Sequence, residues 1–106
     1  MNHNPKITII IPCKNAEKTI QKTFDSLRVQ NYQNLECILM DGNSSDKTMS
    51  IVENNADILN IIISEDDDSG AAACNKAIKL STGDIIGFLY ADDYLANNSL
   101  YEIAHA

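Results

Sequence analysis

The chain has 106 residues, of which 44% are hydrophobic and 22% charged, the size and composition of a single globular domain. Fifteen acidic against eight basic residues give a formal net charge of −7, which argues against nucleic acid and anionic membranes as binding partners. No apolar run approaches the roughly 20 residues that cross a membrane, and residues 1–6 lack the apolar stretch of a signal peptide.

The three cysteines, Cys13, Cys37 and Cys74, are odd in number and form no Cys-x-x-Cys pair, so they predict neither a disulfide framework nor a zinc site. Their apolar neighbours predict reduced, buried, structural thiols. We therefore expect a cytoplasmic chain, with a peripheral position at the inner membrane face as an alternative.

The first predicted strand covers residues 7–11, a run of mostly β-branched residues that Pro12 ends. A helix over about 16–30 should follow, because apolar residues recur from Ile20 at the spacing of one helical face. Asn15 is the expected cap of this helix.

The second strand is expected at residues 35–40, directly before Asp41. Turn-forming and capping residues fill the segment 41–48, and they predict a helix that begins near Ser45 or Asp46 and ends near Asn54.

The third strand is predicted at residues 58–64, and an acidic loop follows it at 65–70. The alanine-rich segment 71–80 predicts a helix, since alanine has the highest helix propensity. Gly83 is the expected left-handed residue that ends this helix.

The apolar and aromatic run 85–91 predicts a fourth strand, which ends in two adjacent carboxylates, Asp92 and Asp93. A final helix is predicted over 96–106. One interpretation of the Asp pair is that it caps this helix. The other is that it forms a hard-oxygen site at the end of a strand, which suits Mg²⁺ or Mn²⁺.

Strands and helices alternate as βαβαβαβα, which predicts the α/β class with a Rossmann-like parallel sheet covered by helices. The carboxyl ends of parallel strands share one edge of the sheet, so Asp41, the acidic loop 65–68 and the pair Asp92–Asp93 should gather there. Carboxylates this close disfavour one another's ionisation unless a cation intervenes, and we therefore expect a divalent cation. The glycine-rich signatures of P-loop and dinucleotide-binding proteins are absent from the sequence.

Several short motifs occur in a fixed order along the chain: Ile7–Pro12 with Asn15 and Thr19-Ile20, Asp41–Thr48, Ser64–Asp67, Asn75–Ile78, Thr82–Ile86 and Leu89–Asp93. In this order and spacing they resemble the inverting family 2 glycosyltransferases, whose nucleotide-sugar-binding half has the GT-A fold. The resemblance covers nearly the whole chain, and its motifs are specific as a set.

The resemblance implies that Asp41 accepts a hydrogen bond from the N3–H of uracil, which suits a carboxylate because it is only an acceptor. It implies that Pro12, Cys13 and Asn15, with Glu17 nearby, line the pocket for the base and the ribose.

The resemblance also assigns the pair Asp92–Asp93 to the Asp-x-Asp-type (DXD) motif, with Ala91 at its first position. Asp92 would contact the ribose, and Asp93 would hold the Mn²⁺ or Mg²⁺ ion that bridges the diphosphate. Asp67 would face the donor from the third loop.

In this family the catalytic base and the acceptor-binding strands lie beyond the DXD motif. We therefore expect residues 1–106 to be a nucleotide-diphospho-sugar-binding domain, truncated before the acceptor-binding half, that binds donor but transfers little sugar by itself. The fourth strand is expected to expose a sheet edge that favours self-association.

The predicted function is transfer of a sugar, with inversion, from a UDP-linked donor to an unidentified acceptor, either a glycan or a lipid-linked sugar. The alternative is a non-catalytic, acidic, metal-binding α/β regulatory module. That alternative explains acidic strand ends but not the ordered set of motifs.

Overall fold

The computed structural model describes residues 4–30, 32–66 and 70–105. Their helices and strands follow one another as β1 (Ile7–Cys13), α1 (Ile20–Arg28), β2 (Leu35–Asp41), α2 (Thr48–Asn54), the 3₁₀ turn η1 (Ala56–Ile58), β3 (Ile61–Ser64), α3 (Gly70–Leu80), β4 (Ile85–Phe88) and α4 (Ser99–Ala104). All strands pair in parallel, in the order β3-β2-β1-β4. The predicted α/β class with a parallel sheet is confirmed.

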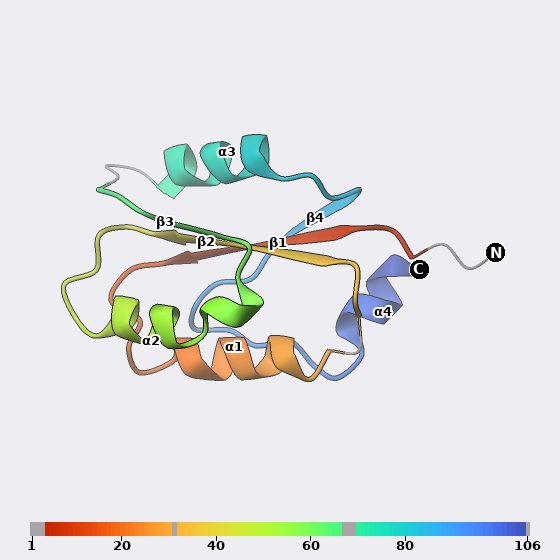
Figure 1. Ribbon diagram of the computed structural model, residues 1–106, viewed down its shortest axis with the longest axis horizontal. Coiled ribbons are helices and arrows are strands. Elements are labelled where there is room, and N and C mark those ends of the chain that lie inside the picture. Colours follow the sequence, from red (N-terminus) through yellow and green to blue (C-terminus); the bar gives the residue numbers. More distant parts are fainter. Residues whose placement is uncertain (1–3, 31, 67–69, 106) are drawn as a thin grey trace.

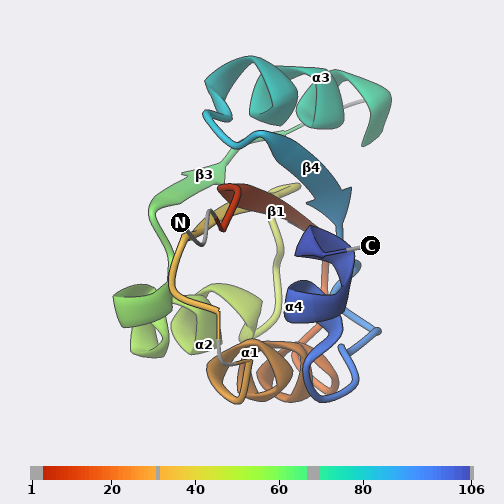
Figure 2. The same ribbon diagram turned by 90° about the vertical axis from the view of Figure 1, so that its right-hand side faces the viewer.

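The sheet separates two layers of helices. Helix α3 lies on one face, and α1, α2 and α4 lie on the other, as Figures 1 and 2 show from two directions. The central strands β1 and β2 are buried along nearly their whole length, whereas β3 and β4 at the two edges alternate between half-buried and exposed residues. This difference follows from position, because a central parallel strand has neighbours on both sides and helices on both faces.

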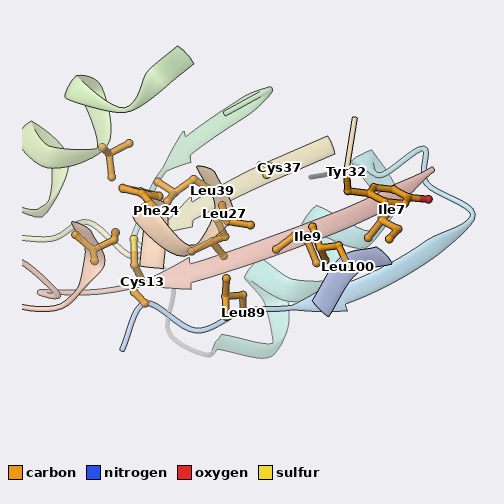
Figure 3. Close-up of a cluster of buried hydrophobic side chains, with 14 residues drawn as sticks. Ile7, Ile9, Cys13, Phe24, Leu27, Tyr32, Cys37, Leu39, Leu89 and Leu100 are labelled. Atoms are coloured by element: carbon orange, nitrogen blue, oxygen red, sulfur yellow. The ribbon is translucent and has the colours of Figure 1, made fainter. Parts of the chain in front are cut away.

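The larger part of the core lies between the sheet and helices α1, α2 and α4 (Figure 3). Alternate residues of β1 point into it, and Phe24 and Leu27 of α1 and Leu100 of α4 meet them there. A smaller cluster fills the space under α3 and consists of Ile10, Ile38, Met40 and Ala77. The two clusters pack against opposite faces of the sheet.

Strand β1 continues two residues beyond its predicted end, because Pro12 does not break it. Pro12 is paired with Met40 of β2, and β4 has already ended at the residue paired with Ile10. The backbone carbonyl of Cys13 points toward β2, where it accepts a hydrogen bond from the Gly42 N–H. Backbone groups of successive strand residues point to opposite sides, so those of Pro12 point toward β4. The missing N–H of Pro12 therefore costs no ladder hydrogen bond.

Helix α1 begins at Ile20, four residues later than predicted, and Asn15 is not its cap. Asn15 has a φ of 51°, a left-handed conformation that Asn tolerates better than most residues. Its side chain binds the next loop of the site instead of the helix. The predicted cap was wrong because a contact distant in sequence takes the side chain away from α1.

Other boundaries also differ from the predictions, and α2 begins at Thr48 instead of near Ser45 or Asp46. Strand β3 begins at Ile61, since residues 56–58 form η1. Strand β4 ends at Phe88, and α4 begins only at Ser99 with Asn98 as its cap residue, so the pair Asp92–Asp93 does not cap that helix. Of the cysteines, Cys13 and Cys37 are buried as predicted, and Cys74 is half-buried. Across the described ranges, each helix is too short or too polar to span a bilayer.

Candidate nucleotide-sugar site

Three connections meet at the carboxyl edge of the sheet: the β1–α1 loop (residues 14–19), the β2–α2 loop (residues 42–47) and the β4–α4 segment (residues 89–98). Because the sheet is parallel, this edge is where α/β folds place their ligands. The predicted convergence of strand ends on one edge of the sheet is therefore present.

Asn15 ties the first two loops together. Its backbone N–H donates to Ser44 Oγ over 2.8 Å, and its side-chain Oδ1 accepts from the Ser45 N–H at 2.8 Å. A further bond runs from the Ala16 N–H to the buried hydroxyl of Thr48, at 2.7 Å. These crossed bonds hold the β1–α1 loop against the start of α2, so the turn has one defined shape.

Asp41, at the end of β2, points inward and is only 3% exposed. Its carboxylate accepts four hydrogen bonds: from the Ser44 N–H (3.0 Å) and hydroxyl, from Ser64 Oγ (2.7 Å) and from Cys13 Sγ (3.5 Å). Burial acts to raise the pKa of Asp41, but these donors outweigh it and hold the pKa below its ordinary value. Asp41 is thus an ionised carboxylate that organises three chain segments.

The thiol of Cys13 remains protonated. Burial and, after it, the neighbouring Asp41 carboxylate raise the pKa of Cys13 far above that of a free thiol. Because the S–H then serves as a donor to Asp41, Cys13 is suited to a structural role and not to nucleophilic chemistry.

An open cavity of about 320 Å³ lies between the β1–α1 loop and the β4–α4 segment. Its wall consists of Pro12, Cys13, Lys14, Asn15, Ala16, Thr19, Tyr90, Ala91 and Asp92. Four of the residues predicted to bind nucleotide therefore line one cavity: Pro12, Cys13, Asn15 and Asp92. A volume of this size is at the lower end of what small-molecule sites have, roughly 300–1,000 Å³.

The other predicted site residues lie outside that wall. Asp41 reaches it only through its contact with Cys13, and Glu17 sits beside it, with its backbone N–H donating to Asp46 Oδ2 over 3.2 Å. Asp93 is exposed and next to the wall residue Asp92. Asp67 lies outside the described residues.

The cavity wall also contains residues that the sequence reasoning did not assign. Lys14 contributes a cation, Tyr90 an exposed aromatic ring, and Thr19 a side chain from the start of α1. Lys14 lies within the Pro12–Asn15 turn that is expected to line the pocket, and Thr19 and Tyr90 belong to the motifs of the resemblance, which gives none of the three a role of its own. The contact of Thr19 with the segment after β4 follows only from the fold.

The expected gathering of carboxylates into a metal site is not present in the protein side chains alone. In the part of the chain that is described, no three His, Cys, Asp or Glu side chains stand together to hold an ion. Asp41 is turned inward, and Glu65 pairs with Lys76 at 2.9 Å. Mg²⁺ and Mn²⁺ are, however, often held by one or two carboxylates with substrate phosphates, and Asp93 beside Asp92 fits that donor set.

Comparison with known proteins gives matches along almost the whole chain. The model of glycosyl transferase family 2 matches residues 8–106. An "uncharacterized glycosyltransferase" of Haemophilus influenzae is 37% identical over 99 residues, covering 91% of this chain and 40% of the relative. The UDP-Glc:alpha-D-GlcNAc-diphosphoundecaprenol beta-1,3-glucosyltransferase WfaP of Escherichia coli is 36% identical over 100 residues, covering 93% of this chain and 40% of the relative.

Solved structures give the same result. S. aureus TarS 1–349, in complex with UDP-GlcNAc, superposes with a TM-score of 0.83 at 28% identity, over 94% of this chain and 30% of that one. The mannosyltransferase PcManGT of Pyrobaculum calidifontis, in complex with GDP-Man and Mn²⁺, has a TM-score of 0.82 at 28% identity, over 91% of this chain and 30% of that one. The chain thus spans less than half the length of each of these proteins.

Proposed function

The chain belongs to glycosyl transferase family 2, and from this premise we propose that it binds the nucleotide of a UDP-linked sugar donor in the cavity beside Asp92. The complete enzyme would transfer the sugar, with inversion, to an acceptor glycan or lipid-linked sugar. The names of the relatives support a nucleotide-sugar donor, since WfaP is named for UDP-Glc and the TarS structure contains UDP-GlcNAc. The GDP-Man in the mannosyltransferase complex makes GDP the competing base.

The observation that carries the proposal is the cavity itself. Pro12, Cys13 and Asn15 come from the end of β1, and Asp92 comes from a segment about 80 residues later, yet all four line one cavity at the carboxyl edge of the sheet. The wall offers polar groups and a cation on one side and the Tyr90 ring and Ala91 on the other, a mixture that suits a base, a ribose and phosphates.

Asp41 is proposed to recognise uracil N3–H, and its surroundings define how this would occur. All four acceptor positions of the carboxylate are taken by the protein, so an incoming N–H must replace one donor. The hydroxyls of Ser44 and Ser64 and the thiol of Cys13 can rotate away, whereas the Ser44 N–H cannot. A base contact therefore requires one of these three side-chain donors to turn aside.

Asp93 is proposed to hold Mn²⁺ or Mg²⁺ together with the diphosphate, and Asp92 to contact the ribose. A bound divalent cation would stabilise negative charge on the departing nucleoside diphosphate. Glu17 is proposed to border the base pocket from the β1–α1 loop. The role proposed for Asp67 concerns a residue outside the described ranges.

Inverting transfer also needs a base that takes the proton of the acceptor hydroxyl. We propose that this carboxylate belongs to the part of the relatives' length that this chain does not match, which is 60% of the H. influenzae protein given the 40% covered. The 106 residues would then bind donor and transfer little sugar by themselves.

Calorimetric titration of the chain with UDP tests the proposal. We expect binding that requires Mn²⁺, and a weaker response to GDP. The Asp92→Asn variant should bind UDP at least roughly tenfold more weakly, because hydrogen bonds to charged groups contribute about 1.5–3 kcal/mol. Asp93→Asn should remove the dependence on Mn²⁺.

Asp25→Asn is the matched control, because Asp25 is an exposed carboxylate on α1 outside the cavity wall. It should bind UDP as the unmodified chain does. If UDP with Mn²⁺ gave no heat, or if the Asp25 and Asp92 variants were equally weakened, the proposal would be wrong. Tighter binding of GDP than of UDP would contradict the donor class alone.

A further inference from the structure

Helix α1 carries a row of polar side chains along one face, four, three and four positions apart, from its cap residue to just past its end: Thr19, Thr23, Ser26 and Gln30. Below, these four are called the clamp row. Thr23 is fully buried, and Ser26 and Gln30 are each 8% exposed. Thr19, at the start of the row, is exposed. Buried polar groups cost free energy unless they are hydrogen-bonded, so the three buried members of the row must have partners.

The partners of the clamp row lie in the β4–α4 segment and, for Gln30, also at Leu100 of α4. The hydroxyl of Thr19 donates to the Ala91 carbonyl over 2.8 Å, and the hydroxyl of Thr23 donates to the Asp93 carbonyl. These two carbonyls belong to the residues on either side of Asp92. The backbone that carries the cavity carboxylate is therefore held from both sides by α1.

Ser26 and Gln30, the last two members of the clamp row, also bind backbone groups after β4. Ser26 Oγ accepts from the Leu95 N–H at 3.0 Å. The amide of Gln30 donates to the Ala96 carbonyl at 2.8 Å and accepts from the Leu100 N–H at 3.2 Å. Every member of the row thus binds backbone groups of one segment, in register along the helix.

The β4–α4 segment depends on these bonds because it has no helix or strand of its own between Phe88 and Ser99. Its internal backbone hydrogen bonds include those from the Asp93 N–H to the Tyr90 carbonyl and from the Ser99 N–H to the Ala96 carbonyl. Such short turns fix local shape but not position relative to the sheet. The Leu89 N–H donates to the Ile10 carbonyl of β1 over 2.9 Å, which fixes only the start of the segment. Further along, its position is set by the clamp row, by the buried side chain of Ala91 and by Lys22 of α1, whose Nζ lies 4.2 Å from the centre of the Tyr94 ring.

We propose that the clamp row positions the Asp92–Asp93 turn for donor binding, with Thr23 as its central positioning residue; the donor-binding part of this inference rests on the proposed function. A carboxylate displaced by even about 1 Å loses much of its contribution to binding and reaction. Helix α1 would then serve the site through its polar face while its apolar face fills the core.

The test compares Thr23→Val with Thr23→Ser in the whole chain. Valine keeps the β-branched shape and removes the hydroxyl, whereas serine keeps the hydroxyl. The matched control is Thr8→Val, because Thr8 is also fully buried but lies near the amino ends of the strands, away from the cavity. Its hydroxyl donates to Glu36 and accepts from the Gly83 N–H.

The first readout is amide hydrogen exchange of Asp93 and Leu95, measured by NMR and corrected for global stability. In Thr23→Val we expect exchange at these amides to accelerate roughly tenfold, the loss of about one hydrogen bond. Thr23→Ser should exchange like the unmodified chain, and Thr8→Val should change only global stability. The second readout is UDP affinity in Mn²⁺, which should fall roughly tenfold in Thr23→Val alone.

Unchanged exchange at Asp93 and Leu95 in Thr23→Val would overturn the inference. Faster exchange at Asp93 and Leu95 with unchanged UDP affinity would also overturn it, because the clamp row would then hold the turn without affecting donor binding. If the unmodified chain fails to bind UDP, the proposed function fails, and the exchange readout by itself decides whether the row holds the turn.

Discussion

Asp41 shows how one buried carboxylate can join several segments next to a cavity that it does not line. Its carboxylate joins the end of β2 to Cys13 on β1, to Ser64 on β3 and to Ser44 in the next loop. The sequence marks Asp41 as a strand-end carboxylate but cannot show that these three donors converge on it. Two of them come from strands that become neighbours only in the folded sheet.

We predict that Asp41→Asn destabilises the chain by about 1–3 kcal/mol at pH 7, because it replaces charge-assisted hydrogen bonds and turns an N–H₂ group toward existing donors. Urea unfolding followed by circular dichroism measures the loss. Asp92→Asn, at an exposed carboxylate, is the control and should stay within about 0.5 kcal/mol of the unmodified chain.

The stability difference between the unmodified chain and Asp41→Asn should also depend on pH. The folded-state pKa of Asp41 is below its ordinary value of 3.8, so its stabilisation is complete well above pH 3.8 and is lost as the pH falls through the folded-state pKa. The difference in unfolding free energy between the unmodified chain and Asp41→Asn should therefore shrink as the pH falls below about 4. A difference that stayed constant down to the acid transition would show that Asp41 is not the ionised acceptor described above.

At the scale of elements, the central strands and the four helices could be predicted because their signals are local. Continuous apolar runs gave β1 and β2, and the alanine-rich segment gave α3 within one residue of its start. The errors fall where distant contacts decide. Strand β3 begins late because Asn60 bonds Cys37 of β2 through both its backbone N–H and its side chain.

The site divides in the same way. Pro12, Cys13, Asn15 and Asp92 line one cavity, because strand ends on a parallel sheet have predictable places, while their binding of a nucleotide stays a prediction. The inward turn of Asp41 and the clamp row on α1 could not be predicted. A threonine or glutamine on a helix face gives no sign of which segment it will bind, since that segment is about 70 residues away.

The connection from α3 to β4 also depends on a distant contact. Gly83 was expected as a left-handed residue, but its φ is not positive. Glycine is needed because β1 lies so close: an added Cβ would stand 2.4 Å from Thr8 Oγ1 and 2.7 Å from the Thr8 backbone nitrogen. The expected conformation was wrong, and close packing is the physical reason for glycine at this position.

Gly83→Ala should therefore destabilise the chain by about 1–3 kcal/mol, since backbone must move to admit one methyl group. Gly87→Ala in β4 is the matched control, because its added Cβ would meet only the flexible tip of Ile9, at 3.3 Å. Thermal unfolding of both variants tests this. Equal stabilities for the two variants would contradict the prediction, because the contact with Thr8 would then not be the reason for glycine at position 83.

At the scale of the whole molecule, β3 and β4 are the two edge strands of the sheet, and no other strand of the described ranges pairs with their outer sides. On β4 the residues Ile86 and Phe88 are 40% and 42% exposed, and their register with Thr8 and Ile10 places them on the face that α3 covers. Helix α3 packs over β1 and β2, and the cluster beneath it includes no residue of β4. The chain thus presents an apolar strand beside unpaired backbone groups, the usual basis of edge-to-edge association.

We propose that the 106-residue chain self-associates through β4 at high concentration. Sedimentation velocity at about 0.15 M salt, where screening reduces repulsion between chains of net charge −7, should show a mass that rises with concentration. Phe88→Lys should shift the chain toward monomer, because a charge on an edge strand opposes pairing. Ile103→Lys adds the same charge at an exposed apolar residue of α4 and should associate like the unmodified chain. A monomer at every concentration, or equal effects of the two lysines, would rule out association through β4.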